Sequence, residues 1–201
     1  MLNNYKTLRS SGKAQKEIKN SIFIGYARLV KNENEAKAFI NEIKRLHEDA
    51  DHNVSAYLVK EEGSFALKYD DDGEPAGSSG KPVFKVIESK GLCNTAVVVT
   101  RYFGGTKLGF GGLSRAYRET AVSAIEDAGI VEVFEELRFT ARFGYPELQK
   151  VKKLVEEYGR IEQEKYTDMI ELCFLIKKDF EEEFREKLTE LTRNKIELRK
   201  A

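Results

Sequence analysis

The sequence predicts an α+β protein of two domains, and three observations support this class. Strand-like runs and helix-like stripes alternate without an internal repeat along all 201 residues. The pattern restarts after Gly129 with a strand in which apolar and polar residues alternate. From there the order of elements is β-α-β-β-α-β, which is the ferredoxin-like split arrangement. We therefore expect an N-terminal domain over residues 1–132 and a ferredoxin-like C-terminal domain over residues 133–201.

The elements of the N-terminal domain are predicted from periodicity and from end signals. In chain order they are a strand over 21–30, a helix to about residue 48, two strands over 54–60 and 64–69 joined by a turn at 61–63, a short helix opened by Pro82, a strand over 95–101 and a helix over 113–128. Asn32, three residues before Glu35, has the spacing of a helix cap. The continuous apolar run Ala96–Val99 is typical of a strand buried on both faces. Gly129 ends the last helix of this domain.

The elements of the C-terminal domain follow in the same way. In chain order they are a strand over 137–143, a helix between Pro146 and Gly159, strands over 160–166 and 169–176, a helix capped by Asp179 with Glu182, and a short strand containing Ile196 and Leu198. Leu148, Val151 and Leu154 have helical spacing and give the first helix one apolar face. Thr167 and Asp168 form the turn between the two middle strands.

Composition excludes several classes of protein. Its 34 basic and 34 acidic residues give a formal net charge of zero, which argues against a uniformly basic nucleic-acid binder but not against a local basic patch. The longest apolar stretches are too short to span a bilayer, and the start lacks the apolar segment of a secretory signal. Cys93 and Cys173 do not form a zinc-ligand pattern with His47 and His52. We expect a cytoplasmic protein with no membrane partner, no disulfide framework, no structural metal and no cofactor.

The first of two glycine-rich loops, residues 70–80, has an acidic front. Its spacing does not match the calcium loop of an EF-hand. A magnesium ion held by one or two carboxylates remains open, beside the alternative that these are solvated turn residues. Asp71, Asp72 and Glu74 are candidate catalytic residues, together with His52, which precedes a strand among acidic neighbours. The alternative for His52 is a structural, hydrogen-bonding role.

The second glycine-rich loop, residues 104–112, lies between a buried strand and the start of a helix. Backbone N–H groups and the helix dipole favour an anion at such a place. The loop matches neither the P-loop nor the dinucleotide-binding fingerprint. The candidate residues for an RNA backbone or another anion are Arg101, Gly104, Gly105, Lys107, Gly111, Gly112 and Arg115. The alternative is that the glycines permit tight turns and that the basic residues pair with the acidic loop, which would place the two loops side by side.

Both loops also carry a specific resemblance. The first contains Asp71-Asp72-Gly73-Glu74-Pro75-x-Gly77-x-x-Gly80-x-Pro82, and the second contains Arg101-Tyr102-Phe103-Gly104-Gly105-x-Lys107-Leu108-Gly109-x-Gly111-Gly112-Leu113-x-Arg115. In this order the two motifs resemble the signature of the YigZ/IMPACT family. Ala76 and Ser78 stand where the family often has Ser and Thr, which puts a hydroxyl role at position 76 in doubt. Residues 134–201 resemble the small C-terminal domain of the bacterial branch, which is similar to domain V of elongation factor G.

The resemblance implies both a fold and a field of function. It implies an N-terminal domain similar to domain 2 of a small-subunit ribosomal protein and to domain IV of elongation factor G, with a left-handed β-α-β crossover. It also implies a link to translation, since eukaryotic relatives regulate translation through a protein partner. Two hypotheses follow. One is a regulatory binding module that contacts RNA, the ribosome or a protein partner in translation; the other is a hydrolase or phosphoryl-type enzyme that uses the acidic loop and His52.

Overall fold

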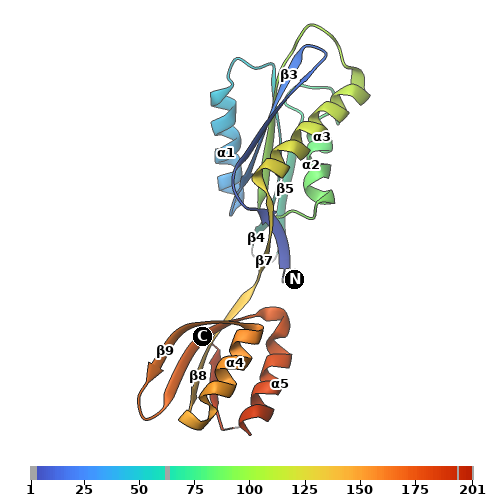
Figure 1. Cartoon of the computed structure of the whole chain (residues 1–201). Helices are drawn as coiled ribbons and strands as arrows, with labels where there is room; N and C mark the ends of the chain where they lie inside the picture. The colour runs from blue at the N-terminus through green and yellow to red at the C-terminus, as the bar shows by residue number, and fades with distance from the viewer. Residues whose placement is uncertain (1–3, 62–63, 194, 201) are drawn as a thin grey trace. The chain divides into compact units, whose positions relative to one another are not determined.

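The computed structural model describes residues 4–61, 64–193 and 195–200, which form two compact units (Figure 1). The first unit contains Tyr5–Val133, and the second contains Asn4 together with the chain from Phe134 onward. Each unit combines helices with its own sheet, so the predicted class of an α+β protein with two domains is confirmed. No helix among the described residues is long and apolar enough to cross a membrane.

A five-stranded antiparallel sheet is the framework of the first unit. Its order is β2-β3-β6-β4-β5. The strands are β2 (Gly12–Ile18), β3 (Ser21–Leu29), β4 (His52–Glu61), β5 (Ser64–Asp70) and β6 (Thr95–Tyr102), and a separate two-stranded sheet joins β1 (Asn4–Leu8) to β7 (Ile130–Phe134). The predicted turn at 61–63 lies partly outside the described residues. β6 is central and almost wholly buried, because strands flank it on both sides and helices cover both of its faces.

Three helices cover this sheet. They are α1 (Glu33–Leu46), α2 (Gly80–Ser89) and α3 (Gly109–Ala128). Alternate residues of β6 show that the helices lie on opposite faces: Ala96 and Val98 pack with α1, whereas Val97 and Val99 pack with α2 and α3. Asn32 Oδ1 accepts a 2.8 Å hydrogen bond from the N–H of Glu35, which confirms the predicted cap of α1.

The two helical crossovers of the sheet have opposite handedness. β3 and β4 are parallel, with β6 between them, and α1 connects them across one face. β5 and β6 are also parallel, with β4 between them, and α2 connects them across the other face. A half-turn about an axis normal to the sheet brings the strands of the second connection into the same direction and order as those of the first. The helix of the second connection then still lies on the opposite face of the sheet. One crossover is therefore left-handed, as the family resemblance implies and against the usual rule.

The sequence pattern does not predict β1 and β2. The inner face of β2 carries the small residues Gly12 and Ala14, because α3 lies very close to it. A Cβ atom on Gly12 would lie 2.2 Å from the carbonyl oxygen of Ala124 in α3. Because small residues are needed where α3 approaches β2, this part of the strand lacks the large apolar side chains on which strand prediction depends.

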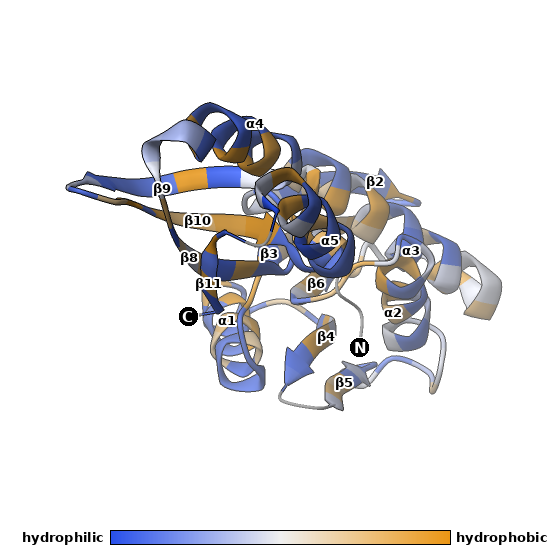
Figure 2. Cartoon of the chain, turned by 90° about the horizontal axis from the view of Figure 1, so that it is seen from below, coloured by the Kyte–Doolittle hydropathy of each residue, from blue (hydrophilic) through white to orange (hydrophobic). Residues whose placement is uncertain are grey.

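The second unit is a four-stranded antiparallel sheet of order β11-β8-β10-β9. Its elements are β8 (Glu136–Phe143), α4 (Leu148–Tyr158), β9 (Gly159–Tyr166), β10 (Ile170–Lys177), α5 (Glu181–Thr192) and β11 (Glu197–Lys200). This order confirms the ferredoxin-like prediction. Apolar residues dominate β10, which is largely orange in Figure 2, and Phe174 of this strand packs against Phe139 and Phe184. The predicted cap Asp179 is wrong, because a 3-10 turn over Lys178–Phe180 separates β10 from α5.

Candidate functional site

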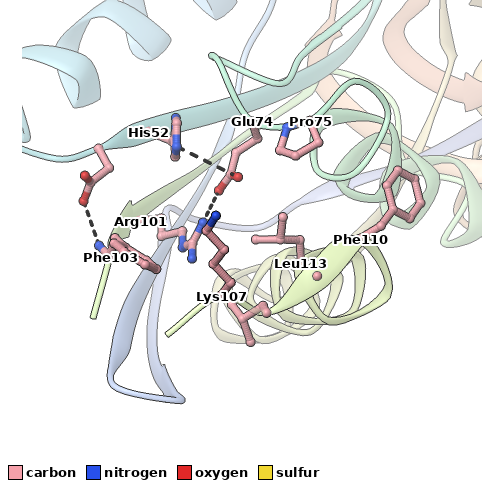
Figure 3. Close-up of a pocket in the computed structure, with 11 residues that line it drawn as sticks. His52, Glu74, Pro75, Arg101, Phe103, Lys107, Phe110 and Leu113 are labelled. Atoms are coloured by element: carbon pink, nitrogen blue, oxygen red, sulfur yellow. Dashed lines mark hydrogen bonds and ion pairs between the residues drawn. The ribbon is translucent and has the colours of Figure 1, made fainter. Parts of the chain in front are cut away.

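A pocket of about 400 Å³ lies where the two glycine-rich loops meet (Figure 3). Its wall is built by the start of β4, the loop after β5, the end of β6 and the first turn of α3. The side chains on which its chemistry depends are His52, Glu74, Arg101, Phe103, Lys107 and Phe110. The expectation that the acidic and basic loops lie side by side is confirmed.

Glu74 and Arg101 form a buried ion pair in the wall of this pocket. Arg101 Nη1 donates to Glu74 Oε1 at 2.7 Å, and the side chains of Arg101 and Glu74 are only 6% and 3% exposed, respectively. The Tyr117 hydroxyl donates to the same oxygen at 2.7 Å. The guanidinium also lies 5.5 Å from the ring centre of Phe23 and 5.1 Å from that of Phe103. The charge of Arg101 is therefore neutralised inside the fold.

The same cluster contains one unused donor and one phenol that stays neutral. Arg101 Nε is buried and is the one such side-chain nitrogen or oxygen without a hydrogen-bond partner in the described part of the chain. Burial raises the pKa of the Tyr117 phenol, and its bond to Glu74 raises it further. An unpaired buried donor costs about 1–3 kcal/mol, so Arg101 is held here at some expense in stability.

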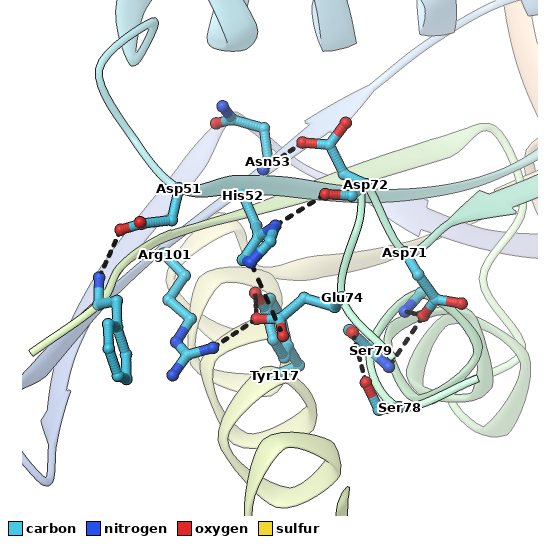
Figure 4. A network of polar contacts seen from close by, with 12 residues as sticks. Asp51, His52, Asn53, Asp71, Asp72, Glu74, Ser78, Ser79, Arg101 and Tyr117 are labelled. Atoms are coloured by element: carbon cyan, nitrogen blue, oxygen red, sulfur yellow. Dashed lines mark hydrogen bonds and ion pairs between the residues drawn. The ribbon is translucent and has the colours of Figure 1, made fainter. Parts of the chain in front are cut away.

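His52 has a fixed ring orientation at the edge of the pocket (Figure 4). Its Nδ1 lies 2.8 Å from the carbonyl oxygen of Asp72, which can only accept a hydrogen bond. The neutral ring therefore carries its proton on Nδ1 and leaves the Nε2 lone pair free. Nε2 lies 3.9 Å from Glu74 Oε2, which is too long for a hydrogen bond. This is a geometry in which His52 can accept a proton.

The carboxylate of Asp71 holds the acidic loop together. It accepts hydrogen bonds from the backbone N–H groups of Gly77, Ser79 and Gly80, at 2.7, 3.0 and 2.7 Å. Burial alone would raise the pKa of Asp71, but these backbone bonds, together with the Ser79 side chain, outweigh it and hold the pKa below its ordinary value. Asp71 does not line the pocket.

Asp72 is likewise engaged in the fold. Its carboxylate accepts from Lys44 Nζ at 2.5 Å and from the backbone N–H of Asn53 at 2.7 Å. Of the four catalytic candidates, only His52 and Glu74 line the pocket. No group of three or more His, Cys, Asp or Glu side chains among the described residues is arranged to hold a metal ion.

α3 begins inside the second glycine-rich loop, four residues earlier than expected. Leu108 occupies the cap position without a side-chain hydrogen bond to the helix. In a helix that starts at Gly109, the N–H groups of Gly109, Phe110 and Gly111 have no partner within the helix. The N–H of Gly112 is the first that can donate within the helix, because it lies four residues after Leu108. The free N–H groups therefore end at Gly111.

Cationic and aromatic side chains surround this helix start. Phe110 is 59% exposed and Phe103 is 44% exposed. Lys107 and Arg115 are exposed and make no ion pair with any residue that the structure describes. A second pocket of about 380 Å³ shares Phe110 and includes Arg115 and Arg118. Lys107 precedes α3, and Arg115 and Arg118 lie on its second and third turns, so these cations gather near the start of the helix.

Two of the candidate glycines have a structural reason to be glycine. A Cβ atom on Gly104 would lie 2.0 Å from the carbonyl oxygen of Asn20, and its N–H donates to Ser21 Oγ at 3.1 Å. Gly105 has a φ of +83°, a conformation that favours glycine. Both residues therefore help to set the path of the loop.

Sequence reasoning missed four residues of the site. Asp51 accepts a 2.7 Å hydrogen bond from the N–H of Phe103 and lines the pocket. Phe103 and Phe110 stand inside the glycine motif, and their exposure is not visible from periodicity. Tyr117 belongs to the apolar stripe of its helix, and only the structure brings its hydroxyl to Glu74.

Comparison with known proteins agrees with this arrangement of loops and domains. Residues 19–125 match the Impact N-terminal domain, which spans both glycine-rich loops, and residues 142–195 match a domain of unknown function, DUF1949. The chain belongs to the IMPACT family. IMPACT family member YvyE of Bacillus subtilis is 36% identical to it over 99% of this chain and 92% of the relative. IMPACT family member YigZ of Escherichia coli is 30% identical over 90% of each chain.

The fold agrees with a solved structure as well. A crystal structure described as that of a hypothetical protein is similar at a TM-score of 0.64 and 28% sequence identity. The similarity covers 98% of this IMPACT family chain and 97% of the other. Both domains of the present chain are therefore shared with that structure.

Proposed function

We propose that this IMPACT family protein is a translation-associated binding protein that contacts RNA at the start of α3. One observation carries the proposal: two exposed aromatic rings, Phe103 and Phe110, stand beside Lys107 and an uncapped helix N-terminus. Proteins bind unpaired RNA by stacking bases on aromatic rings and by holding phosphates with cations and backbone N–H groups. The link to translation is the one that the family resemblance implies.

The candidate residues divide into two roles in this proposal. Lys107, Gly111 and Arg115 contact the phosphate backbone, and the dipole of α3 adds about 0.3–1 kcal/mol at an exposed helix end. Phe110, between the two pockets, stacks on an unpaired base. Arg101 shapes the pocket, because Glu74 already neutralises its charge.

The partners that fit this surface are those of the translation apparatus. Ribosomal RNA supplies unpaired bases next to phosphates, which is the chemistry that the start of α3 accepts. A protein partner in translation control is the other partner that the family implies, and it would use acidic side chains in place of phosphates. The cytoplasmic location expected from the sequence stays a prediction.

The test is RNA binding across a range of salt concentrations. The full chain is titrated against a fluorescent RNA hairpin with an unpaired loop, followed by anisotropy. Because phosphate contacts release counterions, we expect the double variant Lys107→Ala/Arg115→Ala to lower the logarithmic salt slope by about one to two units. The matched control, Lys150→Ala/Lys153→Ala, removes two charges from α4 and should leave the slope unchanged. An unchanged slope in the first variant, or no binding by the wild type at low salt, would reject RNA as the ligand of this site.

A second candidate function is hydrolysis or phosphoryl transfer, and the ring orientation of His52 favours it. The carbonyl oxygen of Asp72 accepts a hydrogen bond from His52 Nδ1, which leaves the lone pair on Nε2. Nε2 lies 3.9 Å from Glu74 Oε2 and can act as a general base. The test is hydrolysis of p-nitrophenyl phosphate esters by the wild type and by His52→Ala. If this candidate is right, the variant loses hydrolysis and keeps the RNA salt slope. If wild type and variant both lack activity, the phosphate-ester reaction is rejected.

A further inference from the structure

β5 is the last strand of the five-stranded sheet, and within the described residues it pairs with β4 alone. Phe65, Leu67 and Tyr69 alternate along it and are 47%, 55% and 42% exposed, respectively. Alternate residues of a strand face the same side, so these three form one apolar stripe. The stripe lies on the α2 side of the sheet, since Leu67 pairs with Leu58 and the ring of Tyr69 lies 5.7 Å from that of Phe84.

An open apolar edge strand is a surface that proteins normally cover. It presents unpaired backbone N–H and C=O groups, and natural proteins shield such groups with charges, bulges, short strands or a partner strand. Seven residues long, β5 carries a single lysine, Lys68, whose side chain lies on the face opposite the stripe. The stripe itself therefore has no charge to discourage pairing.

We propose that two copies of this chain pair through β5, antiparallel, across a two-fold axis at Leu67. An aromatic residue lies two positions before Leu67 in β5 and another lies two positions after it. In this register Leu67 meets its own copy, Phe65 meets Tyr69, and Ala66 meets Lys68. Aromatic and aliphatic cross-strand pairs of this kind stabilise a sheet, and a two-fold interface is formed by a self-complementary patch. A peptide from another protein would need no such symmetry, so the pattern favours a second copy.

Charge and strand length select this register over its neighbours. A slip of two residues in one direction places Lys68 opposite its own copy, and like charges directly opposite each other are destabilising. A slip of two residues in the other direction leaves Tyr69 without a partner residue inside β5. A slip of one residue turns the two stripes to opposite faces of the joined sheet. Only the register centred on Leu67 pairs all three apolar residues.

The proposed pairing joins the two five-stranded sheets into one continuous sheet. A two-fold axis normal to the sheet places both α2 helices on the same face, on either side of the joined stripes. Because the contact consists of one short strand from each copy, it belongs to the small, weak class of interfaces. We therefore expect a monomer–dimer equilibrium that depends on protein concentration.

The first test compares the wild type with Leu67→Lys by sedimentation equilibrium over a series of concentrations of the full chain. The wild-type mass should rise towards twice that of the monomer, and the variant should stay monomeric, because two lysines would meet on the axis. Leu46→Lys is the matched control, since Leu46 is 63% exposed on α1, and it should dimerise like the wild type. Thermal melts of both variants establish that they are folded. A wild type that is monomeric throughout, or a folded Leu67→Lys variant that still dimerises, overturns the proposal.

The second test checks the register with cysteine pairs in a Cys173→Ser background. Directly opposite strand residues have Cα atoms about 4.5–5.5 Å apart, which is within the range of a disulfide. Under mild oxidation Leu67→Cys should form a covalent dimer, because the residue faces its own copy. Lys68→Cys should not, because it faces Ala66. Cross-linking of both variants to the same extent, or none by Leu67→Cys, overturns the proposed register.

Discussion

Arg101 Nη1 and Glu74 Oε1 lie 2.7 Å apart and join the end of β6 to the loop that follows β5. The acidic loop thus meets the strand that leads into the second glycine-rich loop through a buried ion pair. The acidic partner is Glu74, whereas Asp72 pairs with Lys44. The shape of the candidate pocket depends on this pair, since both side chains form its wall.

We predict that Glu74 and Arg101 are strongly coupled in stability. Removing one partner leaves the other charge buried and unpaired, so Arg101→Met and Glu74→Gln should each lower the free energy of unfolding by about 3–5 kcal/mol. The double variant should lose less than the sum, with a coupling energy of about 0.5–3 kcal/mol from urea unfolding. A cycle of Arg101→Met with Asp72→Asn is the control, and its coupling should be smaller. Equal coupling in both cycles would contradict the pairing.

Asp71 should make the first unit sensitive to acid. Its pKa is lowered in the folded state, so its stabilisation is fully present above the unfolded pKa of about 3.9 and is lost as the pH falls through the folded pKa. Asn has one acceptor oxygen where Asp has two, so Asp71→Asn should cost about 1–3 kcal/mol at pH 7. The variant should also lose less stability than the wild type when urea unfolding is followed below pH 4. Asp168→Asn, in an exposed turn, should match the wild type, and an Asp71→Asn profile parallel to the wild type would refute this role.

Substitutions of two glycines should separate folding from binding. A Cβ atom on Gly111 has no neighbour within 4 Å, whereas one on Gly104 meets the backbone of Asn20 at 2.0 Å. Gly111→Ala should therefore keep the melting temperature or raise the free energy of unfolding by up to about 1 kcal/mol. It should nevertheless weaken RNA binding, because the methyl group narrows the approach to the first turn of α3. Gly104→Ala should lower the melting temperature. RNA affinity unchanged by Gly111→Ala would argue against a phosphate at this turn.

The C-terminal domain should fold without the rest of the chain. Its apolar core, from Leu137 to Leu198, is drawn entirely from the second unit. Residues 133–201 expressed alone should give a cooperative thermal transition by circular dichroism and bind no hydrophobic dye. A molten product that binds the dye would show that this domain depends on the first unit.

The fold could be predicted from the sequence wherever large apolar residues mark one face. The apolar run of β6 and the stripes of α1 and α4 give such signals, and both the elements and the ferredoxin-like order are as expected. β2 could not be predicted, since the closeness of α3 places the small residues Gly12 and Ala14 on the inner face of the strand and leaves Ile18 as the one large apolar residue there. The handedness of a crossover also escapes local patterns, because it depends on which face of the sheet a helix covers.

The two motifs predict the region where the candidate pocket forms but not its contacts. Glycine and charged residues in a loop mark a place where the chain turns and carries polar groups, and both motifs contribute residues to the pocket. Spacing does not say which acid meets which base, so the pairing of Glu74 with Arg101 required the three-dimensional arrangement. Spacing also does not show which residue of an apolar helix stripe makes a polar contact, as the hydroxyl of Tyr117 does with Glu74.

The central position of β6 determines how the first unit can form during synthesis. β3 and β4 each pair with β6 and not with each other, yet β6 follows both of them along the chain. In a nascent chain that ends before Thr95, β3 and β4 therefore each have one edge without its partner strand, and the helices have no complete sheet to pack on. Because the middle of the sheet closes only when β6 inserts, we expect this unit to complete its fold late in translation.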